Sequence, residues 1–324
     1  MTPAAPMRWQ RVLALDHLTL LDIAPPDFVG LAAGAGFDAV GLRIAPATAD
    51  ESPWPMSPGS RMLADTVARC QDTGVTVLDA EMIRLTPRTD LVAAEAVLEA
   101  AAELKASHLT TIGEDPDLTR LCERFAELTR MAAPYGVRPL IEFMAYKTVR
   151  TLDDAVAIAA GSGGGVLLDA LHIQRCGADI AQIARMDRAL LGYVQLCDAP
   201  LEPPGEAGLP GDRVLPRGQT PDGGAAAREA RAGRLLPGEG SLPLTELLSV
   251  LPATIPVAVE APRLSLRDRL TPAEVAARAR RSLDQVLARW RDQSDPRDHR
   301  DPRDRRGPRD HRDAAADRDR NVSD

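Results

Sequence analysis

Short apolar runs alternate with longer amphipathic segments along most of the chain. Apolar runs of about four to eight residues bounded by glycine or proline are typical of buried strands, and apolar residues that recur every three or four positions are typical of helices. We predict eight strands, at 12–15, 39–44, 75–82, 109–112, 139–143, 165–169, 193–196 and 257–260. We predict helices between them at 26–35, 60–73, 90–106, 117–135, 152–160, 178–186 and 243–250, followed by a closing helix at 272–291.

This alternation predicts an α/β protein. Repeated strand–helix units imply parallel strands joined by right-handed crossovers, and eight of them favour a single closed (β/α)8 barrel, a TIM barrel, over an open sheet. Gly36, Gly74 and Gly136 follow predicted helices, where glycine commonly ends a helix in the left-handed conformation. No GxGxxG motif lies between the first strand and the first helix, which disfavours a dinucleotide-binding fold.

The composition changes near the C-terminus of the 324-residue chain. From residue 291 onward there are ten Arg, ten Asp and almost no large apolar residue, so this segment cannot bury enough surface to offset its ordering entropy. A TIM barrel takes about 250 residues. We therefore predict one barrel domain at 1–290 and a disordered tail at 291–324. A second stretch, 200–234, is rich in Pro, Gly, Ala and Arg and is predicted to be a long irregular loop.

Charge and composition exclude several classes of function. The formal net charge is −8, whereas a nucleic-acid-binding protein usually carries a basic patch. No apolar run is long enough to cross a membrane, and the N-terminus has no uninterrupted apolar region of the kind found in secretory signals. The cysteines form no CxxC pair, so we expect reduced thiols and a cytoplasmic protein; they are Cys70, Cys122, Cys176 and Cys197. The sequence leaves homo-oligomerisation open.

Acidic residues end three of the predicted strands. The active sites of TIM barrels form at the C-terminal ends of the strands, and Glu142, Asp169 and Glu260 each follow apolar strand residues. Three carboxylates that converge on one barrel mouth repel each other unless a cation lies between them. Gln195 ends the seventh strand and adds an amide oxygen. Four oxygen ligands predict one divalent metal ion, with Mn2+ or Mg2+ preferred and Co2+ or Zn2+ also compatible. The alternative is that each acid pairs with an arginine.

His172 follows Asp169 by three residues, in the turn that leaves the sixth strand. Beside a metal ion, a neutral imidazole can remove a proton alpha to a carbonyl group, while the metal polarises the carbonyl and holds the enolate. We therefore predict His172 as a catalytic base, with Glu142 or Glu260 as the base in an epimerase-like variant. The alternative for His172 is a residue of a surface turn.

Several of these motifs together carry a family resemblance. Residues 18–44, LTLLDIAPPDFVGLAAGAGFDAVGLRI, look like a first strand, helix and second strand of the xylose isomerase-like barrels, which include sugar phosphate isomerases and epimerases. The Glu of strand 5, the Asp-x-x-His of strand 6, the Glu of strand 8 and the LPGEG turn at 236–240 are similar to motifs of the same group, so the resemblance spans about residues 12–290. It implies that Glu142, Asp169 and Glu260 bind a metal and that His172 contacts substrate or moves protons.

The chain departs from the epimerase pattern at strand 7, where Gln195 stands in place of the usual His. A Gln there with a nearby acid, here Asp198, is similar to the 3-dehydroshikimate dehydratase branch. That branch has a substrate-binding Arg three residues before its Pro-Gly turn, a place that Arg234 occupies. The resemblance implies that Arg234 binds a substrate carboxylate or phosphate and that Asp198 contacts substrate. The serine of that branch is Ala230 here, and its Arg-Asp pattern at strand 3 is missing.

These residues lead to one main hypothesis. We expect a metal-dependent isomerase or epimerase that acts on a small polyhydroxy carbonyl compound by alpha-proton abstraction. Glu81 and Arg84 are candidate contacts for substrate hydroxyl groups, or else a surface ion pair. The first alternative is a dehydratase of the 3-dehydroshikimate type, which shares the proton abstraction. The second is a barrel without catalysis that binds a small molecule. A DNA-repair nuclease of the same fold would need a histidine-rich site, which this sequence does not supply.

Overall fold

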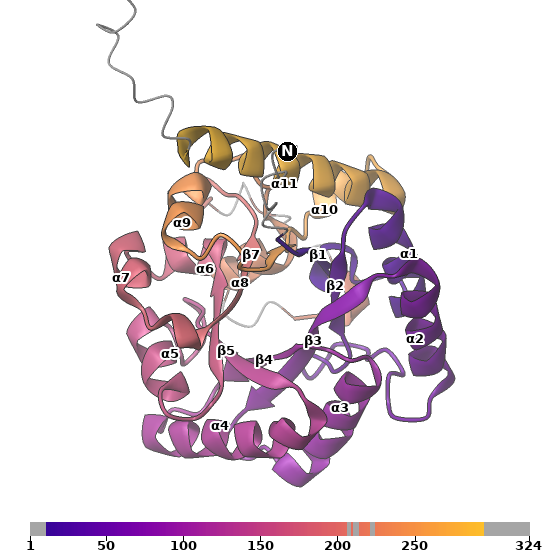
Figure 1. The fold of residues 1–324 in the computed structure, drawn as a ribbon, viewed down its shortest axis with the longest axis vertical. Helices are drawn as coiled ribbons and strands as arrows, with labels where there is room; N and C mark the ends of the chain where they lie inside the picture. The colour runs from indigo at the N-terminus through magenta and orange to yellow at the C-terminus, as the bar shows by residue number, and fades with distance from the viewer. Residues whose placement is uncertain (1–10, 206–208, 210–213, 221–223, 295–324) are drawn as a thin grey trace, which may run out of the picture.

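The computed structural model describes residues 11–205, 209, 214–220 and 224–294. Eight parallel strands pair in sequence order, and β1 pairs with β8 to close the barrel (Figure 1). The prediction of a TIM barrel is therefore confirmed. The strands are β1 (Leu13–Asp16), β2 (Ala39–Arg43), β3 (Thr76–Leu85), β4 (His108–Gly113), β5 (Arg138–Glu142), β6 (Gly165–Asp169), β7 (Leu191–Leu196) and β8 (Val257–Val259).

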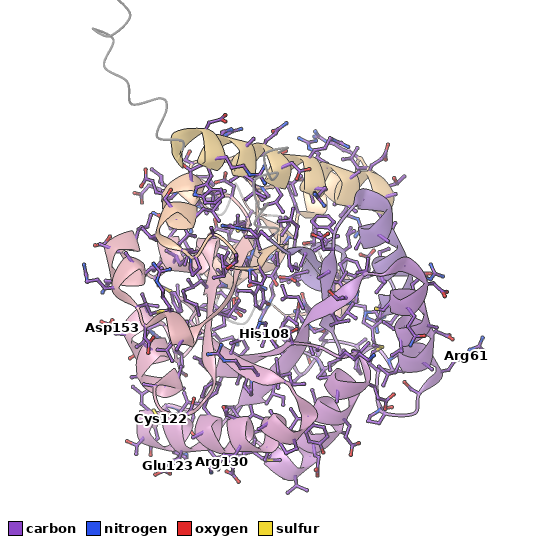
Figure 2. The ribbon with its side chains drawn as sticks, in the orientation of Figure 1. Arg61, His108, Cys122, Glu123, Arg130 and Asp153 are labelled. Atoms are coloured by element: carbon purple, nitrogen blue, oxygen red, sulfur yellow. The ribbon has the colours of Figure 1, made fainter. Side chains whose placement is uncertain are left out.

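A ring of helices surrounds the barrel, and the long α11 packs against α1 and α9 (Figure 1). Charged side chains such as Arg61, Asp153 and Arg130 lie at the outer rim in Figure 2, whereas His108 lies near the barrel centre. The helices are α1 (Pro25–Ala35), α2 (Arg61–Thr73), α3 (Leu91–Glu103), α4 (Leu118–Ala132), α5 (Leu152–Ala159), α6 (Ala170–Arg175), α7 (Ile180–Arg185), α8 (Gly224–Ala232), α9 (Leu244–Val250), α10 (Leu264–Arg267) and α11 (Pro272–Ser294).

Local signals in the sequence account for many helix ends. The side chains of Asp90, Asp117 and Thr151 each accept a hydrogen bond from a backbone N–H in the first turn of α3, α4 and α5, respectively. These bonds satisfy N–H groups that have no partner within the helix. Gly36 follows α1 with a φ of 86°, a left-handed conformation that glycine adopts without a Cβ clash.

The structure differs from the predicted elements at several points, and the short helices α6 and α10 were not predicted. Residues 224–232, within the predicted irregular loop, form α8; the sequence AAAREARA has high helix propensity, and Ala227 and Ala230 are buried. The closing helix continues to Ser294, so the first four residues of the predicted tail are helical. The rest of that tail lies outside the described residues.

Two layers of side chains fill the core. The larger layer lies between the strands and the helices. A smaller cluster is contributed by seven strands and consists of Ala14, Ala39, Leu78, Leu140, Leu167, Tyr193 and Ala258. Residues two apart on a strand face the same side. The interior of the barrel is thus apolar at this level, and the next inward residues along the strands form the candidate site.

Candidate active site

Polar side chains lie one layer above the apolar cluster, at the C-terminal ends of five strands. Each stands two residues after a member of that cluster, and all five are buried: Asp16, Glu142, Asp169, Gln195 and Glu260. The alternation of the strands therefore directs them into the barrel mouth. The predicted metal ligands Glu142, Asp169, Gln195 and Glu260 are in this set. Asp16 was not predicted, although its position after the apolar run of β1 carried the same signal.

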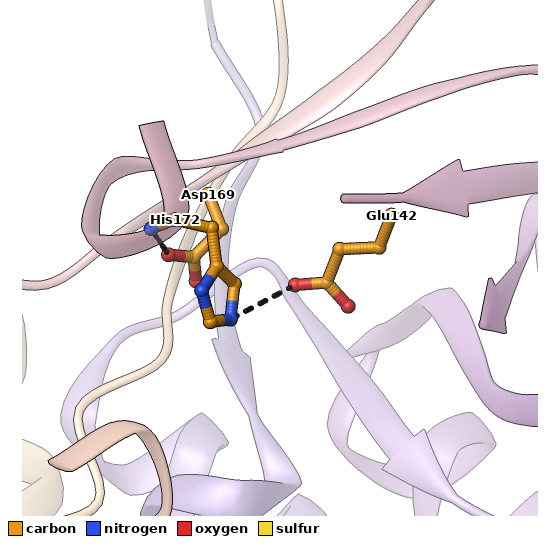
Figure 3. A group of neighbouring side chains, drawn as sticks. All are labelled: Glu142, Asp169 and His172. Atoms are coloured by element: carbon orange, nitrogen blue, oxygen red, sulfur yellow. Dashed lines mark hydrogen bonds and ion pairs between the residues drawn. The ribbon is translucent and has the colours of Figure 1, made fainter. Parts of the chain in front are cut away.

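Glu142, Asp169 and His172 form one cluster, in which one oxygen or nitrogen atom from each lies within 4.8 Å of the others (Figure 3). Asp169 ends β6, and its Oδ1 accepts a 3.0 Å hydrogen bond from the backbone N–H of His172 in α6. Nε2 of His172 is 3.7 Å from Oε1 of Glu142. The cap that starts α6 therefore aims the imidazole at the carboxylate of β5.

The charge states of this cluster follow from burial. Burial lowers the pKa of His172 to about 4, so the ring is neutral near pH 7 and can accept a proton. Burial, together with repulsion from Glu260 and Asp169, raises the pKa of Glu142 well above its usual value. Burial also acts to raise the pKa of Asp169, but Arg234 and His172 outweigh it and hold that pKa below its ordinary value.

Arg234 joins two of the predicted metal ligands. Its Nη1 is 2.5 Å from Oδ2 of Asp169 and 3.0 Å from Oε2 of Glu260. Its Nε donates to the carbonyl oxygen of Ala230 in α8, which fixes the guanidinium against the barrel mouth. Arg234 was predicted to bind substrate, but in the structure it contacts the carboxylates. This is the acid–arginine pairing that the sequence left open as the alternative to a metal ion. One guanidinium compensates only one of the three carboxylates.

Gln195 joins the two sides of the mouth. Its Nε2 donates to Oδ2 of Asp16 at 2.8 Å and lies 3.3 Å from Oε1 of Glu260. Its Oε1 is buried and has no hydrogen-bond partner within the described part of the chain. Asp16 thus fixes the orientation of the amide and leaves its oxygen atom available as a ligand.

Asp16, Glu81 and Glu260 form a second acidic cluster, with one oxygen atom of each within 4.8 Å of the others. Burial, then Glu81 and Glu260, raise the pKa of Asp16 well above its ordinary value. A Cβ at Gly41 would lie 2.2 Å from Oδ1 of Asp16, so only glycine leaves room for this side chain. Glu81 pairs with Arg43, whose guanidinium also contacts Glu51.

A cavity of about 450 Å³, including open space at its mouth, lies over these residues. Its lining includes Glu142, His172, Arg234 and Glu260. Several other polar lining residues were not predicted: Arg43, Tyr146, Lys147, Gln219 and Arg231. Arg43 ends β2, and the others lie on loops or on α8, where no periodic pattern marks them.

Two predicted substrate contacts lie elsewhere. Arg84 pairs with Glu114 and is not among the residues that line the cavity. Asp198 accepts 2.9 Å hydrogen bonds from the backbone N–H groups of Gly238 and Leu242, so it organises the turn at 236–240. Glu81, another predicted substrate contact, does not line the cavity. It lies beside Glu260 in the second acidic cluster.

The residues present fit a divalent cation. The carboxylates at the ends of β5, β6 and β8 carry more negative charge than Arg234 compensates, and the amide oxygen of Gln195, unpaired among the described residues, would supply a neutral ligand. An all-oxygen set with one amide is typical of hard cations such as Mg2+ or Mn2+. His172, beside Glu142 and Asp169, adds an imidazole that zinc or cobalt would accept.

Comparisons with known proteins agree with this architecture. A family model described as "Xylose isomerase-like TIM barrel" matches residues 29–286. The solved structure of the IOLI protein with a bound zinc atom has a TM-score of 0.68 and 18% identity, covering 86% of this chain and 98% of that one. A D-psicose 3-epimerase solved in the presence of D-fructose has a TM-score of 0.59 and 18% identity, covering 85% and 98%. An L-ribulose 3-epimerase has a TM-score of 0.62 and 14% identity, covering 88% and 97%.

At these identities the likeness shows a shared fold. A search of curated proteins gives no significant match. Among the described residues, none of the helices has both the length and the apolar character needed to span a membrane.

Proposed function

The chain belongs to the xylose isomerase-like TIM barrel family, and from this premise we propose that it is a divalent-metal-dependent isomerase or epimerase of a small polyhydroxy carbonyl compound. One observation carries the proposal: three buried carboxylates gather at the barrel mouth, where Glu142 and Glu260 line a cavity and Asp169 shares Arg234 with Glu260. Gln195, whose amide oxygen is unpaired among the described residues, lies beside Glu260. The solved structures similar to this chain include a D-psicose 3-epimerase and an L-ribulose 3-epimerase, which favours this reaction class.

Glu142, Asp169, Gln195 and Glu260 would hold the cation. A divalent ion supplies Lewis-acid polarisation of a substrate carbonyl group. Arg234 keeps Asp169 and Glu260 together through the two contacts of its Nη1, and Asp16 keeps the amide of Gln195 in one orientation. These two residues therefore position the ligands rather than react.

His172 and Glu142 are the candidates for proton transfer. Both line the cavity, and their side-chain atoms lie 3.7 Å apart. Since the imidazole is neutral near pH 7, its Nε2 can accept a proton from the carbon next to the carbonyl and return it elsewhere on the substrate. Glu142 and Glu260 flank the same cavity, so either can serve as the second base that an epimerisation requires.

The test is a screen of the full-length protein loaded with Mn2+, Mg2+, Co2+ or Zn2+. The compounds are keto sugars, ketose phosphates, inososes and 3-dehydroshikimate. We expect an isomerised or epimerised product, with the rate reduced by at least about 100-fold in Glu260→Gln, a loss typical of removing acid–base or ligand groups. Glu99→Gln, an exposed position on α3, is the matched control and should keep the full rate. A dehydrated product of 3-dehydroshikimate would assign the chain to the dehydratase alternative. Activity unchanged in Glu260→Gln would refute the site.

A further inference from the structure

Four basic side chains from separate elements line the cavity: Arg43, Lys147, Arg231 and Arg234. Three of them are neutralised by carboxylates. Arg43 pairs with Glu51 and Glu81, Lys147 with Glu114, and Arg234 with Asp169 and Glu260. Arg231 is the exception within the part of the chain that the structure describes.

Arg231 is buried at the end of α8, with 6% of its surface exposed. Its Nη1 donates to the carbonyl oxygen of Thr220, and its guanidinium carbon lies 5.9 Å from the centre of the Tyr146 ring. Within the described residues no carboxylate forms an ion pair with it. A guanidinium has five N–H donors and stays charged at any ordinary pH, so its other nitrogens remain available to a group in the cavity.

A buried charge without a counter-ion is costly, and proteins usually compensate it with a partner or a ligand. Among the described residues, Thr220 and Tyr146 offer Arg231 only a neutral carbonyl and a ring face, so a counter-ion for it would enter from the cavity that it lines. The guanidinium fork matches the paired oxygens of a carboxylate or a phosphate.

The position of Arg231 links this anion site to the proposed chemistry. Tyr146 lies between the two: its ring centre is 5.7 Å from that of His172 and 5.9 Å from the guanidinium carbon of Arg231. Lys147 Nζ is also 5.9 Å from the Tyr146 ring and adds positive charge to the same wall. Arg231, His172 and Glu142 all line the same cavity, so one ligand can place an anionic group at Arg231 and its reacting carbons at His172 and Glu142.

We propose that Arg231 binds an anionic group, a carboxylate or a phosphate, at the end of the substrate away from the reacting carbons. The inference rests on the proposed function in one respect, namely that the bound anion is part of a substrate. Anion binding at Arg231 can be measured independently of any activity. It moves the role that the sequence suggested for Arg234 to a residue three positions earlier. It also narrows the substrate class from neutral sugars to sugar acids, hydroxy-keto acids or ketose phosphates.

The first experiment measures anion binding by isothermal titration calorimetry, with inorganic phosphate and glycolate as probes. We expect the wild-type protein to bind one of them, and the one that binds distinguishes a phosphate from a carboxylate. Arg231→Gln should weaken that binding by about 10- to 100-fold, as expected for losing a charge-assisted hydrogen-bond pair. Arg231→Lys keeps the positive charge but lacks the two-pronged guanidinium, so its affinity for the anion should lie between those of the wild type and Arg231→Gln.

Arg228→Gln is the matched control, since it removes one positive charge from the same helix at a position that does not line the cavity. It should bind like the wild type. Melting temperature and circular dichroism check that each variant is folded. Equal binding by wild type and a folded Arg231→Gln, or no binding of either anion by the wild type, would overturn the proposal.

The second experiment separates this inference from the proposed function. Metal-loaded wild type and Arg231→Gln are compared on a neutral ketose and on its phosphate or its acid. We expect kcat/KM to fall by about 10- to 100-fold only for the anionic compound. If the anion binds through Arg231 but no compound is turned over, the proposed function fails and the anion site stands. If the neutral ketose alone is turned over, equally by both proteins, the anion site fails and the proposed function stands.

Discussion

Arg234 Nη1 lies 2.5 Å from Oδ2 of Asp169, and both side chains are almost completely buried. The same nitrogen is 3.0 Å from Glu260, so one guanidinium holds two carboxylates of the candidate metal site. Removing a partner from a buried ion pair costs about 3–5 kcal/mol, because the remaining charge stays buried without compensation.

We therefore predict that Arg234→Met lowers the free energy of unfolding by about 3–5 kcal/mol, measured by urea denaturation. Arg278→Gln, which breaks an exposed pair with Glu239, should cost less than about 1 kcal/mol. Adding a divalent cation should stabilise Arg234→Met more than the wild type, since the cation would replace the lost positive charge. A loss of stability no greater than that of Arg278→Gln would contradict the role of this arginine.

The unpaired Oε1 of Gln195 gives a prediction about metal affinity. Gln195→Leu keeps the approximate size of the side chain and removes the oxygen, so we expect metal affinity to fall by about 10- to 100-fold, the range seen when a contact that supports a metal site is lost. Calorimetric titration with Mn2+ measures the change, and Gln285→Leu on the exposed face of α11 is the control. Equal affinity in the two variants would argue that Gln195 is no ligand.

His108 makes stability depend on pH. Burial, with a contribution from Arg138, lowers its pKa from 6.5 to about 4. Between these values the unfolded chain binds more protons than the folded protein, so the free energy of unfolding falls as the pH is lowered from about 6.5 to 4. His108→Phe keeps an aromatic ring against Tyr193. It should reduce the decrease in the free energy of unfolding over this pH range by up to about 3 kcal/mol. Urea denaturation at several pH values tests it, and identical slopes for both proteins would refute it.

Asp198 is expected to affect stability rather than substrate binding. Its carboxylate accepts hydrogen bonds from the backbone N–H groups of Gly238 and Leu242. Asp198→Ala removes the partner of both donors, and leaving the buried N–H of Leu242 unsatisfied costs about 1–3 kcal/mol. We expect a lower melting temperature with an unchanged KM once a substrate is known. A changed KM in a folded variant would restore the predicted substrate contact.

The sequence by itself determined the fold and the position of the site at the C-terminal ends of the strands. Strand periodicity placed Leu140 below Glu142 and Ala258 below Glu260 on the same inward face, and eight such strands close only one way. Glycines and capping residues set the helix ends for the same local reason. These features depend on neighbours in the chain, so the sequence is enough to predict them.

Tertiary structure decided which partner each charge has. Asp169 and Arg234 are 65 residues apart, and Asp16 and Gln195 are 179 apart. Only closure of the barrel brings such pairs within hydrogen-bond distance. Sequence reasoning could foresee that the carboxylates need a cation, but not that Arg234 supplies part of that charge while Asp198 serves a turn. Nor could it find Arg231, because only the three-dimensional structure shows that it lines the cavity and that no carboxylate of the described residues pairs with it.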